Sequence, residues 1–134
     1  MGKRGSDIPA AELEVLGALF RLGRGTVREV LVDLEGQGRR LAYTTVLTLL
    51  SRLEKRGTLH CDREGQAHIY RPRVSRMRVA ADRVASLVKR LGGEEPVPLI
   101  LELVEAQKLS AGDLRQLRQL LDRLEGEAPK RGKR

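Results

Sequence analysis

Residues 41–72 decide the fold, and their sequence is LAYTTVLTLLSRLEKRGTLHCDREGQAHIYRP. Apolar side chains in the first half recur at the spacing of one helix face, which predicts a helix over residues 41–56. Gly57 follows in the position that commonly ends a helix. Beyond it the apolar period shortens to two, and this pattern predicts two short strands, 59–63 and 67–71, joined by a turn. The stretch therefore predicts one helix followed by a β-hairpin.

Two further helices are predicted before this stretch. Residues 8–22 carry an apolar stripe at helical spacing and end at a glycine-rich turn. Thr26 and Glu29 form a capping-box pattern that starts a second, shorter helix extending through Leu34. Three short helices followed by a hairpin is the element order of a winged helix-turn-helix, whose third helix is the recognition helix for DNA.

Three more helices are predicted after the hairpin. Residues 74–91 form a long helix, and over 73–91 six basic residues stand against one acidic residue. Residues 98–106 are apolar nearly all round, and a last helix beginning near Ser110 carries a leucine stripe. Helices of this kind must be buried, either in a dimer or in a monomeric bundle. The predicted fold class is mainly α with a small β-hairpin: a winged helix-turn-helix followed by a C-terminal helical region, which the family resemblance described below identifies as a dimerisation region.

The polar side of the third helix is the candidate surface for DNA recognition. Thr45, Thr48 and Arg52 follow one another at i, i+3 and i+7, opposite the apolar stripe. Threonine hydroxyls and methyls suit phosphates, base edges and the thymine methyl, and arginine suits phosphate or guanine. Thr44 and Lys55 extend the same face. The alternative interpretation is an ordinary solvated helix face.

Composition favours double-stranded DNA as the partner. The 134 residues include 26 Lys and Arg against 18 Asp and Glu, and this net charge of +8 favours an anionic partner, nucleic acid before a membrane surface. One Phe, two Tyr and no Trp argue against stacking on single strands. No apolar run predicts a transmembrane helix and no signal-peptide pattern is present, so we expect no membrane partner and a cytoplasmic protein.

A single cysteine, Cys61, excludes an intramolecular disulfide. It lies on the predicted hairpin with His60 and His68, which supply too few ligands for tetrahedral zinc, so we expect no metal and no cofactor. A two-residue turn places Cys61 opposite His68, and a three-residue turn places it opposite Ile69. No catalytic triad, P-loop or carboxylate pair stands out, so we expect no enzyme. The role of Cys61 stays open.

The sequence resembles the penicillinase-repressor family of bacterial transcriptional regulators, of the BlaI/MecI type, to which the CopY copper repressors are related. The resemblance extends over about residues 8–125, and it rests on the order and spacing of its motifs because no single motif is specific. The segments that carry it are AELEVL (11–16), LAYTTVLTLLSRL (41–53), KRG (55–57), EGQA (64–67), YRP (70–72), LILELVE (99–105) and LS (109–110).

The resemblance implies a transcriptional repressor that binds a dyad-symmetric operator as a homodimer. Residues 8–72 would be the winged-helix DNA-binding domain and residues 73–125 the helical dimerisation domain. Residues 1–7 and 126–134 are expected to be disordered basic tails. The alternative function is a winged-helix protein-interaction module without sequence-specific DNA binding.

The resemblance also implies roles for individual residues. Tyr43 and Thr44 would lie at the N-terminal end of the recognition helix, where the family often has Pro-Lys, so the base preference is expected to differ. Arg63 would lie on the hairpin, or wing, near phosphate or the minor groove. The DNA-binding residues would then be Tyr43, Thr44, Thr45, Thr48, Arg52, Lys55 and Arg63, and the dimer contacts Leu99, Ile100, Leu103, Val104, Leu114, Leu117 and Leu121.

Two departures from the family pattern bear on regulation. A membrane-bound sensor metalloprotease inactivates some members by cutting an Asn-Phe bond in the fifth helix. Glu102 and Leu103 stand at those positions here, so a regulatory protease acting by that route is not expected. Copper-responsive relatives end in a cysteine-rich cluster, whereas this sequence ends in Gly, Lys and Arg, so copper sensing by that route is not expected either.

Overall fold

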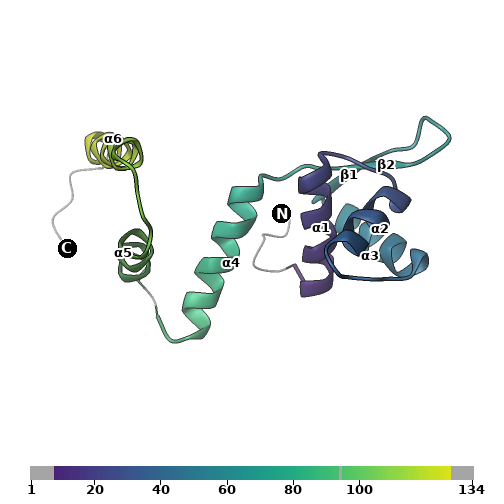
Figure 1. Cartoon of the computed structure of the whole chain (residues 1–134), viewed down its shortest axis with the longest axis horizontal. Helices are drawn as coiled ribbons and strands as arrows, with labels where there is room; N and C mark the ends of the chain where they lie inside the picture. Colours follow the sequence, from purple (N-terminus) through teal and green to yellow (C-terminus); the bar gives the residue numbers. More distant parts are fainter. Residues whose placement is uncertain (1–7, 94, 128–134) are drawn as a thin grey trace. The chain divides into compact units, whose positions relative to one another are not determined.

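The computed structural model describes residues 8–93 and 95–127, which form six helices and a two-stranded antiparallel hairpin (Figure 1). The chain divides after Gly93 into two compact units. The predicted fold class, mainly α with a small β-hairpin, is confirmed. The elements in chain order are α1 (Ala10–Leu22), α2 (Val27–Gly36), α3 (Tyr43–Lys55), β1 (Leu59–Asp62), β2 (Ile69–Pro72), α4 (Arg76–Arg90), α5 (Val97–Ala106) and α6 (Ala111–Glu127).

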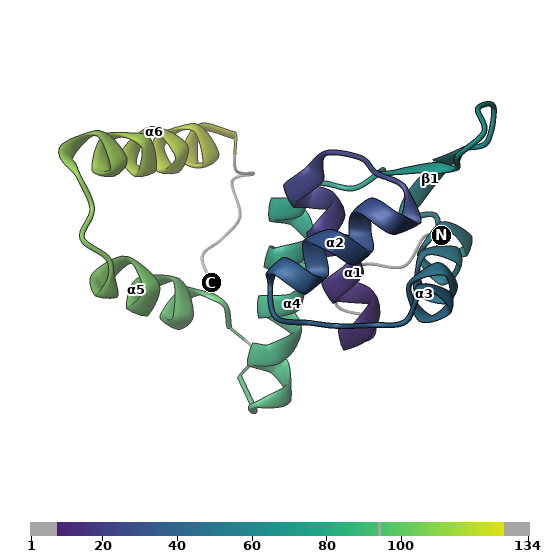
Figure 2. The same cartoon turned by 45° about the vertical axis from the view of Figure 1, so that its right-hand side comes forward.

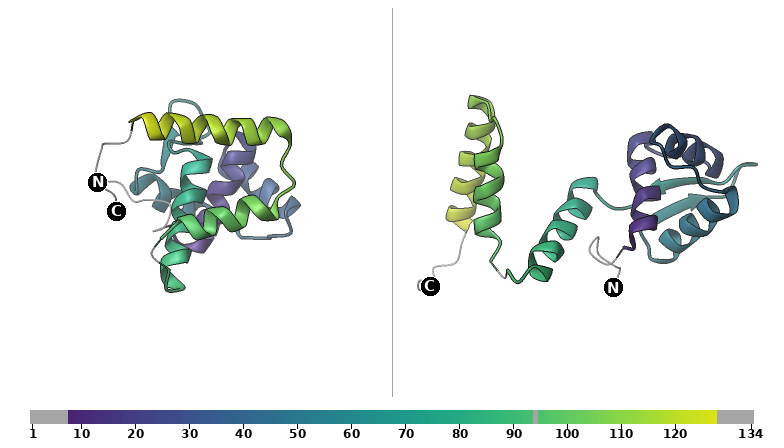
Figure 3. Two further views of the ribbon diagram at one scale, coloured as in Figure 1. Left: turned by 90° about the vertical axis from the view of Figure 1, so that its left-hand side faces the viewer. Right: turned by 60° about the horizontal axis from the view of Figure 1, so that its bottom comes forward.

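The first unit is a winged helix, in which α1, α2 and α3 pack against one another around an apolar core. Leu16 of α1, Val30 of α2, Leu50 of α3 and Tyr70 of β2 are among its fully buried side chains. β1 packs against α3 and β2 against α1 (Figure 3, right). Gly25 exchanges two backbone hydrogen bonds with Tyr70, of 2.9 and 2.8 Å, and so fixes the base of the hairpin to the turn before α2.

Side-chain caps explain where several helices begin. The Thr26 hydroxyl accepts a hydrogen bond of 3.1 Å from the Glu29 N–H, and the Thr26 N–H donates to the Glu29 carboxylate at 2.9 Å, which confirms the predicted capping box. Ser110 and Asp113 form the same reciprocal pair before α6. The hydroxyl of Ser75 caps α4. Each cap satisfies backbone N–H groups that a helix start leaves unpaired.

The loop of the hairpin is longer than predicted. Six residues join the strands, and Cys61 lies opposite Tyr70, so the expected partners His68 and Ile69 are both wrong. The Asp62 carboxylate accepts a hydrogen bond of 3.0 Å from the backbone N–H two residues later. This local side-chain turn ends the strand pairing early. The loop consequently projects beyond the three helices (Figures 1 and 2).

The first half of α4 is held to the winged helix by its side chains. Val79 is 5% exposed and belongs to the core. Arg83 donates a hydrogen bond to the carbonyl oxygen of Ile8. Arg76 donates to the carbonyl oxygen of Phe20 at 3.4 Å, and its guanidinium lies 5.9 Å from the centre of the Phe20 ring. α4 therefore packs with the first unit, and its assignment to a dimerisation domain stays a prediction.

The C-terminal helix α6 extends through Glu127, two residues into the segment expected to be a tail. No proline lies between Ala111, where α6 begins, and Pro129. The glycine at position 126 weakens a helix but is tolerated within it. The rest of the two predicted tails, residues 1–7 and 128–134, lies outside the described residues.

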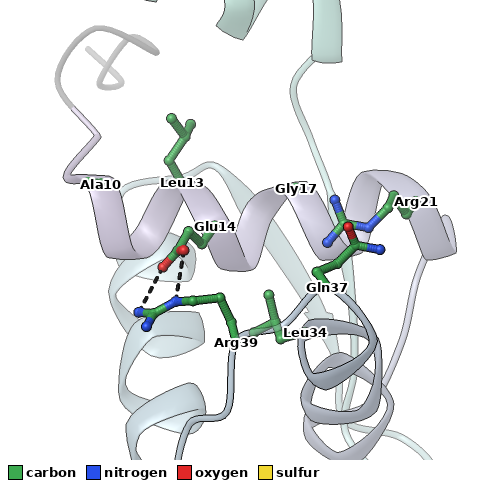
Figure 4. Close-up of a pocket in the computed structure, with 8 residues that line it drawn as sticks. All are labelled: Ala10, Leu13, Glu14, Gly17, Arg21, Leu34, Gln37 and Arg39. Atoms are coloured by element: carbon green, nitrogen blue, oxygen red, sulfur yellow. Dashed lines mark hydrogen bonds and ion pairs between the residues drawn. The ribbon is translucent and has the colours of Figure 1, made fainter.

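A groove of about 350 Å³ runs between α1 and α2 (Figure 4). Its charged side chains are paired within the protein, because Arg39 donates hydrogen bonds of 2.9 and 3.1 Å to Glu14, and Arg21 donates to Asp33. Gly17 lines the groove from the middle of α1. A Cβ atom added there would contact the Arg21 guanidinium at 3.7 Å, which is an ordinary van der Waals distance.

Replacing this glycine is expected to stabilise the protein. Gly17→Ala should raise the free energy of unfolding by about 0.5–1 kcal/mol, because glycine weakens the middle of a helix by that amount relative to alanine. Thermal unfolding should show a Tm higher by about 4 °C. Gly57→Ala is the control of opposite sign, since Gly57 has φ = 85° and an L side chain is strained there. A lower Tm for Gly17→Ala would contradict the prediction.

Candidate nucleic-acid interface

Helix α3, the candidate recognition helix, exposes a broad polar face. At about 100° per residue, Thr44, Thr48 and Lys55 lie along its centre, with Thr45 and Arg52 toward one edge. All five are exposed, and so is Tyr43 at the start of the helix. The residues on the opposite side are buried against α1, α2 and β1, and they are Val46, Leu49, Leu50 and Leu53. The structure thus brings the six predicted DNA contacts of α3 together on one open surface.

The remaining edge of this face carries Tyr43 and Glu54. The Arg28 guanidinium of α2 lies 5.7 Å from the centre of the Tyr43 ring, a distance suited to a cation–π contact. Arg28 therefore joins the candidate interface beside the N-terminal end of α3. The sequence offered no signal for it, because the contact depends on the turn between α2 and α3.

The wing contributes Arg63, although not as a free cation. Its Nη1 and Nη2 atoms each donate a hydrogen bond of 2.8 Å to the two carboxylate oxygens of Glu54 (Nη1 to Oε2, Nη2 to Oε1). The Arg63 side chain is 52% exposed and that of Glu54 is 28% exposed. These hydrogen bonds hold the pKa of Glu54 below its usual range and raise the pKa of Arg63. Both groups are consequently charged at neutral pH.

A buried ion pair lies behind the face and ties α3 to α1. The Arg56 guanidinium, at the C-terminal end of α3, donates to the Glu12 carboxylate at 2.7 Å. The Glu12 side chain is 2% exposed and that of Arg56 is 21% exposed. Such a pair fixes the position of the end of α3 relative to the helix behind it. Sequence reasoning missed this contact, since Glu12 resembles a solvated acidic residue in the first turn of a helix.

The inner face of the hairpin is apolar in character and belongs to the core. Cys61 and Tyr70 are buried there. Burial raises the pKa of the Cys61 thiol and raises the pKa of Tyr70 to about 12, so both side chains are neutral at pH 7. His60 lies on the exposed side of β1. Within residues 8–93 and 95–127, no cluster of three or more His, Cys, Asp or Glu side chains has a geometry that could hold a metal ion.

The second unit exposes apolar surface along both of its helices. None of the described residues of α5 and α6 is buried in the single chain. Leu103, Val104, Leu117 and Leu120 help to line an open groove of about 490 Å³ between the two helices. No helix in the part of the chain that the structure describes has the length and hydropathy of a membrane span. The predicted dimer contacts are half-buried at Leu99, Val104 and Leu117 and exposed at Ile100, Leu103, Leu114 and Leu121.

A family model and two relatives match most of this chain. The penicillinase repressor family model matches residues 8–123. An uncharacterized 16.5 kDa protein from the ptsI 3′ region of Latilactobacillus sakei is 30% identical over 131 residues, which cover 98% of this chain and 89% of that protein. The penicillinase repressor of Bacillus licheniformis is 26% identical over 120 residues, which cover 90% of this chain and 93% of the repressor.

Solved structures similar to the chain include two that share its fold in part. The solution structure of the DNA-binding domain of the repressor BlaI is 30% identical with a TM-score of 0.48, and the match covers 57% of this chain and 90% of that domain. The complex structure of hsRosR-S4 is 13% identical with a TM-score of 0.52, and the match covers 76% of this chain and 90% of that chain. The second likeness concerns the fold alone.

Proposed function

Since the chain belongs to the penicillinase repressor family, whose members are DNA-binding transcriptional repressors and not enzymes, we propose that it binds a dyad-symmetric operator as a homodimer. The exposed face of α3 is the observation that carries this proposal. Three threonines, an arginine and a lysine lie there on a helix whose other side is fully buried. These side chains can donate to phosphates and base edges and can contact thymine methyl groups.

The wing and α2 complete the proposed contact surface. Arg63 lies on the loop side of the hairpin and Arg28 beside Tyr43, so cations flank α3 on the edge opposite Arg52. In a helix-turn-helix, contacts to the DNA backbone set the orientation of the recognition helix, whereas the helix itself specifies the sequence. We assign Arg28 and Arg63 to the backbone and the α3 threonines with Arg52 to the bases.

The apolar surface of α5 and α6 supports a second copy of the chain as the dimer partner. Side chains such as Ile100, Leu103 and Leu121, each about half exposed, would lose contact with water in such an interface. Burial of apolar surface is the main driving force of permanent association. A dimer also matches the proposed dyad symmetry, because each copy would then bind one half-site.

We do not expect regulation by the sensor metalloprotease that inactivates some relatives. Glu102 and Leu103, which stand where that protease cuts an Asn-Phe bond, are exposed residues of α5. We therefore expect an inducing signal other than cleavage at this bond.

The proposal is tested by binding to defined duplexes. An operator can be selected from a pool of random duplexes and compared with the promoter region of the protein's own gene. We expect the selected sequence to have dyad symmetry and to bind at least about 10³-fold more tightly than random duplex. Equal binding to both would instead support a winged-helix protein-interaction module.

Removing the Arg52 side chain is expected to weaken operator binding. Arg52→Ala should lower the affinity by about 5- to 150-fold, which corresponds to the 1–3 kcal/mol of one arginine contact with DNA. Fluorescence anisotropy at several salt concentrations measures the effect, and wild-type affinity should fall steeply with salt. Arg78→Ala in α4 is the matched control, since it removes the same charge from an exposed helix outside the interface. Equal losses in both variants would contradict the role of Arg52.

A further inference from the structure

The contact between α3 and the wing places an acid where the proposed function calls for cations. Glu54 is ionised at neutral pH, and its carboxylate lies at the edge of the DNA-facing surface. A carboxylate in this position repels phosphate and offers no hydrogen-bond donor to it. Its presence on α3 needs an explanation other than attraction to DNA.

The Glu54–Arg63 pair also contributes too little to the stability of the fold to account for the acid. Both side chains of the pair are partly exposed, and ion pairs at such positions contribute little to the stability of a protein. The base of the hairpin is already fixed by the two hydrogen bonds between Gly25 and Tyr70 and by the Arg73 N–H, which donates to the Thr58 carbonyl oxygen at 2.8 Å. The Glu54–Arg63 pair instead fixes the side-chain orientation of Arg63, which is the first residue of the projecting loop.

The geometry of the pair leaves part of Arg63 available. A guanidinium carries five N–H groups, and the two hydrogen bonds to Glu54 use one on each terminal nitrogen. Three N–H groups remain for another acceptor, and their direction is set by Glu54. The carboxylate also neutralises most of the charge that Arg63 would present to a duplex in any orientation.

We propose that Glu54 is a specificity-determining positioning residue, which holds Arg63 so that this arginine contacts the DNA backbone only when α3 is seated on its operator. This inference rests on the proposed function. On a random duplex the neutralised pair adds little attraction. On the operator the oriented N–H groups of Arg63 meet a phosphate. Discrimination between the two duplexes is the difference between these binding free energies.

The test compares dissociation constants of the full-length protein for the selected operator and for a random duplex. Glu54→Gln keeps the size of the side chain and removes its charge. We expect about threefold tighter binding to random duplex and about tenfold lower discrimination, because a freed arginine attracts phosphate without regard to sequence. In an Arg63→Gln background, Glu54→Gln should leave discrimination unchanged, since Glu54 acts through Arg63.

Glu14→Gln is the matched control. It removes the same charge from another two-hydrogen-bond pair with an arginine, Arg39, which joins α1 to the loop before α3 (Figure 4). Discrimination should stay within about twofold of wild type, and the Tm of each variant confirms folding. The proposal is overturned if Glu54→Gln behaves like Glu14→Gln, or if it lowers discrimination equally in the Arg63→Gln background. Absence of discrimination in the wild-type protein would instead refute the proposed function.

Discussion

Introducing a charge on the apolar side of α6 is expected to convert the proposed dimer into monomers. Leu121 is 59% exposed in the single chain, so Leu121→Glu should not disturb the fold of one copy. In the proposed dimer the same carboxylate would lie unpaired in an apolar interface, which costs several kcal/mol. Light scattering coupled to gel filtration should therefore report a mass of 14.9 kDa per particle in place of twice that value.

Loss of the dimer should also reduce operator binding by a large factor. When two half-sites are bound by one dimer, the second contact is intramolecular, and this raises the overall affinity by about 10²- to 10⁴-fold. Leu121→Glu should lose that factor, whereas affinity for one half-site should be unchanged. Gln119→Glu is the control, because it places the same side chain on the other side of α6. A Leu121→Glu variant that remains dimeric would contradict the assignment of this interface.

Breaking the buried ion pair behind α3 should destabilise the winged helix strongly. Glu12→Ala leaves the Arg56 guanidinium, which is only 21% exposed, without the carboxylate at 2.7 Å. Removing one partner of a buried pair costs about 3–5 kcal/mol. We expect the lower end of this range, about 3 kcal/mol, because water reaches part of Arg56. Thermal unfolding should show a Tm lower by about 15 °C.

Glu14 provides the comparison for this effect on the same helix. It too is bonded to an arginine, Arg39, at 2.9 Å, but its side chain is 38% exposed. Glu14→Ala should therefore lower the free energy of unfolding by no more than about 1 kcal/mol. Because both carboxylates have an arginine partner, the difference between the two losses of stability measures the effect of burial. Similar losses for Glu12→Ala and Glu14→Ala would show that the buried pair does not stabilise the contact between α1 and α3.

Local patterns were sufficient to predict the order and type of the elements. The capping box at Thr26 and Glu29 and the cap at Ser75 involve residues three apart or fewer, and both appear in the structure. The polar face of α3 follows from helical spacing alone. In contrast, the hairpin register depends on where the turn begins. The turn at Asp62 leaves six residues between the strands, where a turn of two or three was predicted.

The charges around α3 could not be assigned from the sequence because their partners are distant along the chain. Glu12 pairs with a residue 44 positions away, and its burial follows from the packing of α1 on α3. Arg63 was predicted as a wing cation, but the eight residues between it and Glu54 fold so that the two side chains meet. These hydrogen bonds make Glu54 part of the candidate interface, which its contribution to the net charge could not indicate.

The most direct test of the account is the discrimination ratio of the α3 face. Dissociation constants for the selected operator and for a random duplex are measured for the wild-type protein and for a variant with Thr45, Thr48 and Arg52 all replaced by alanine. We expect a ratio of at least about 10³ for wild type and a ratio near one for the variant, which should remain folded and dimeric. A wild-type ratio near one, or a variant that keeps the full ratio, would contradict the proposed role of α3.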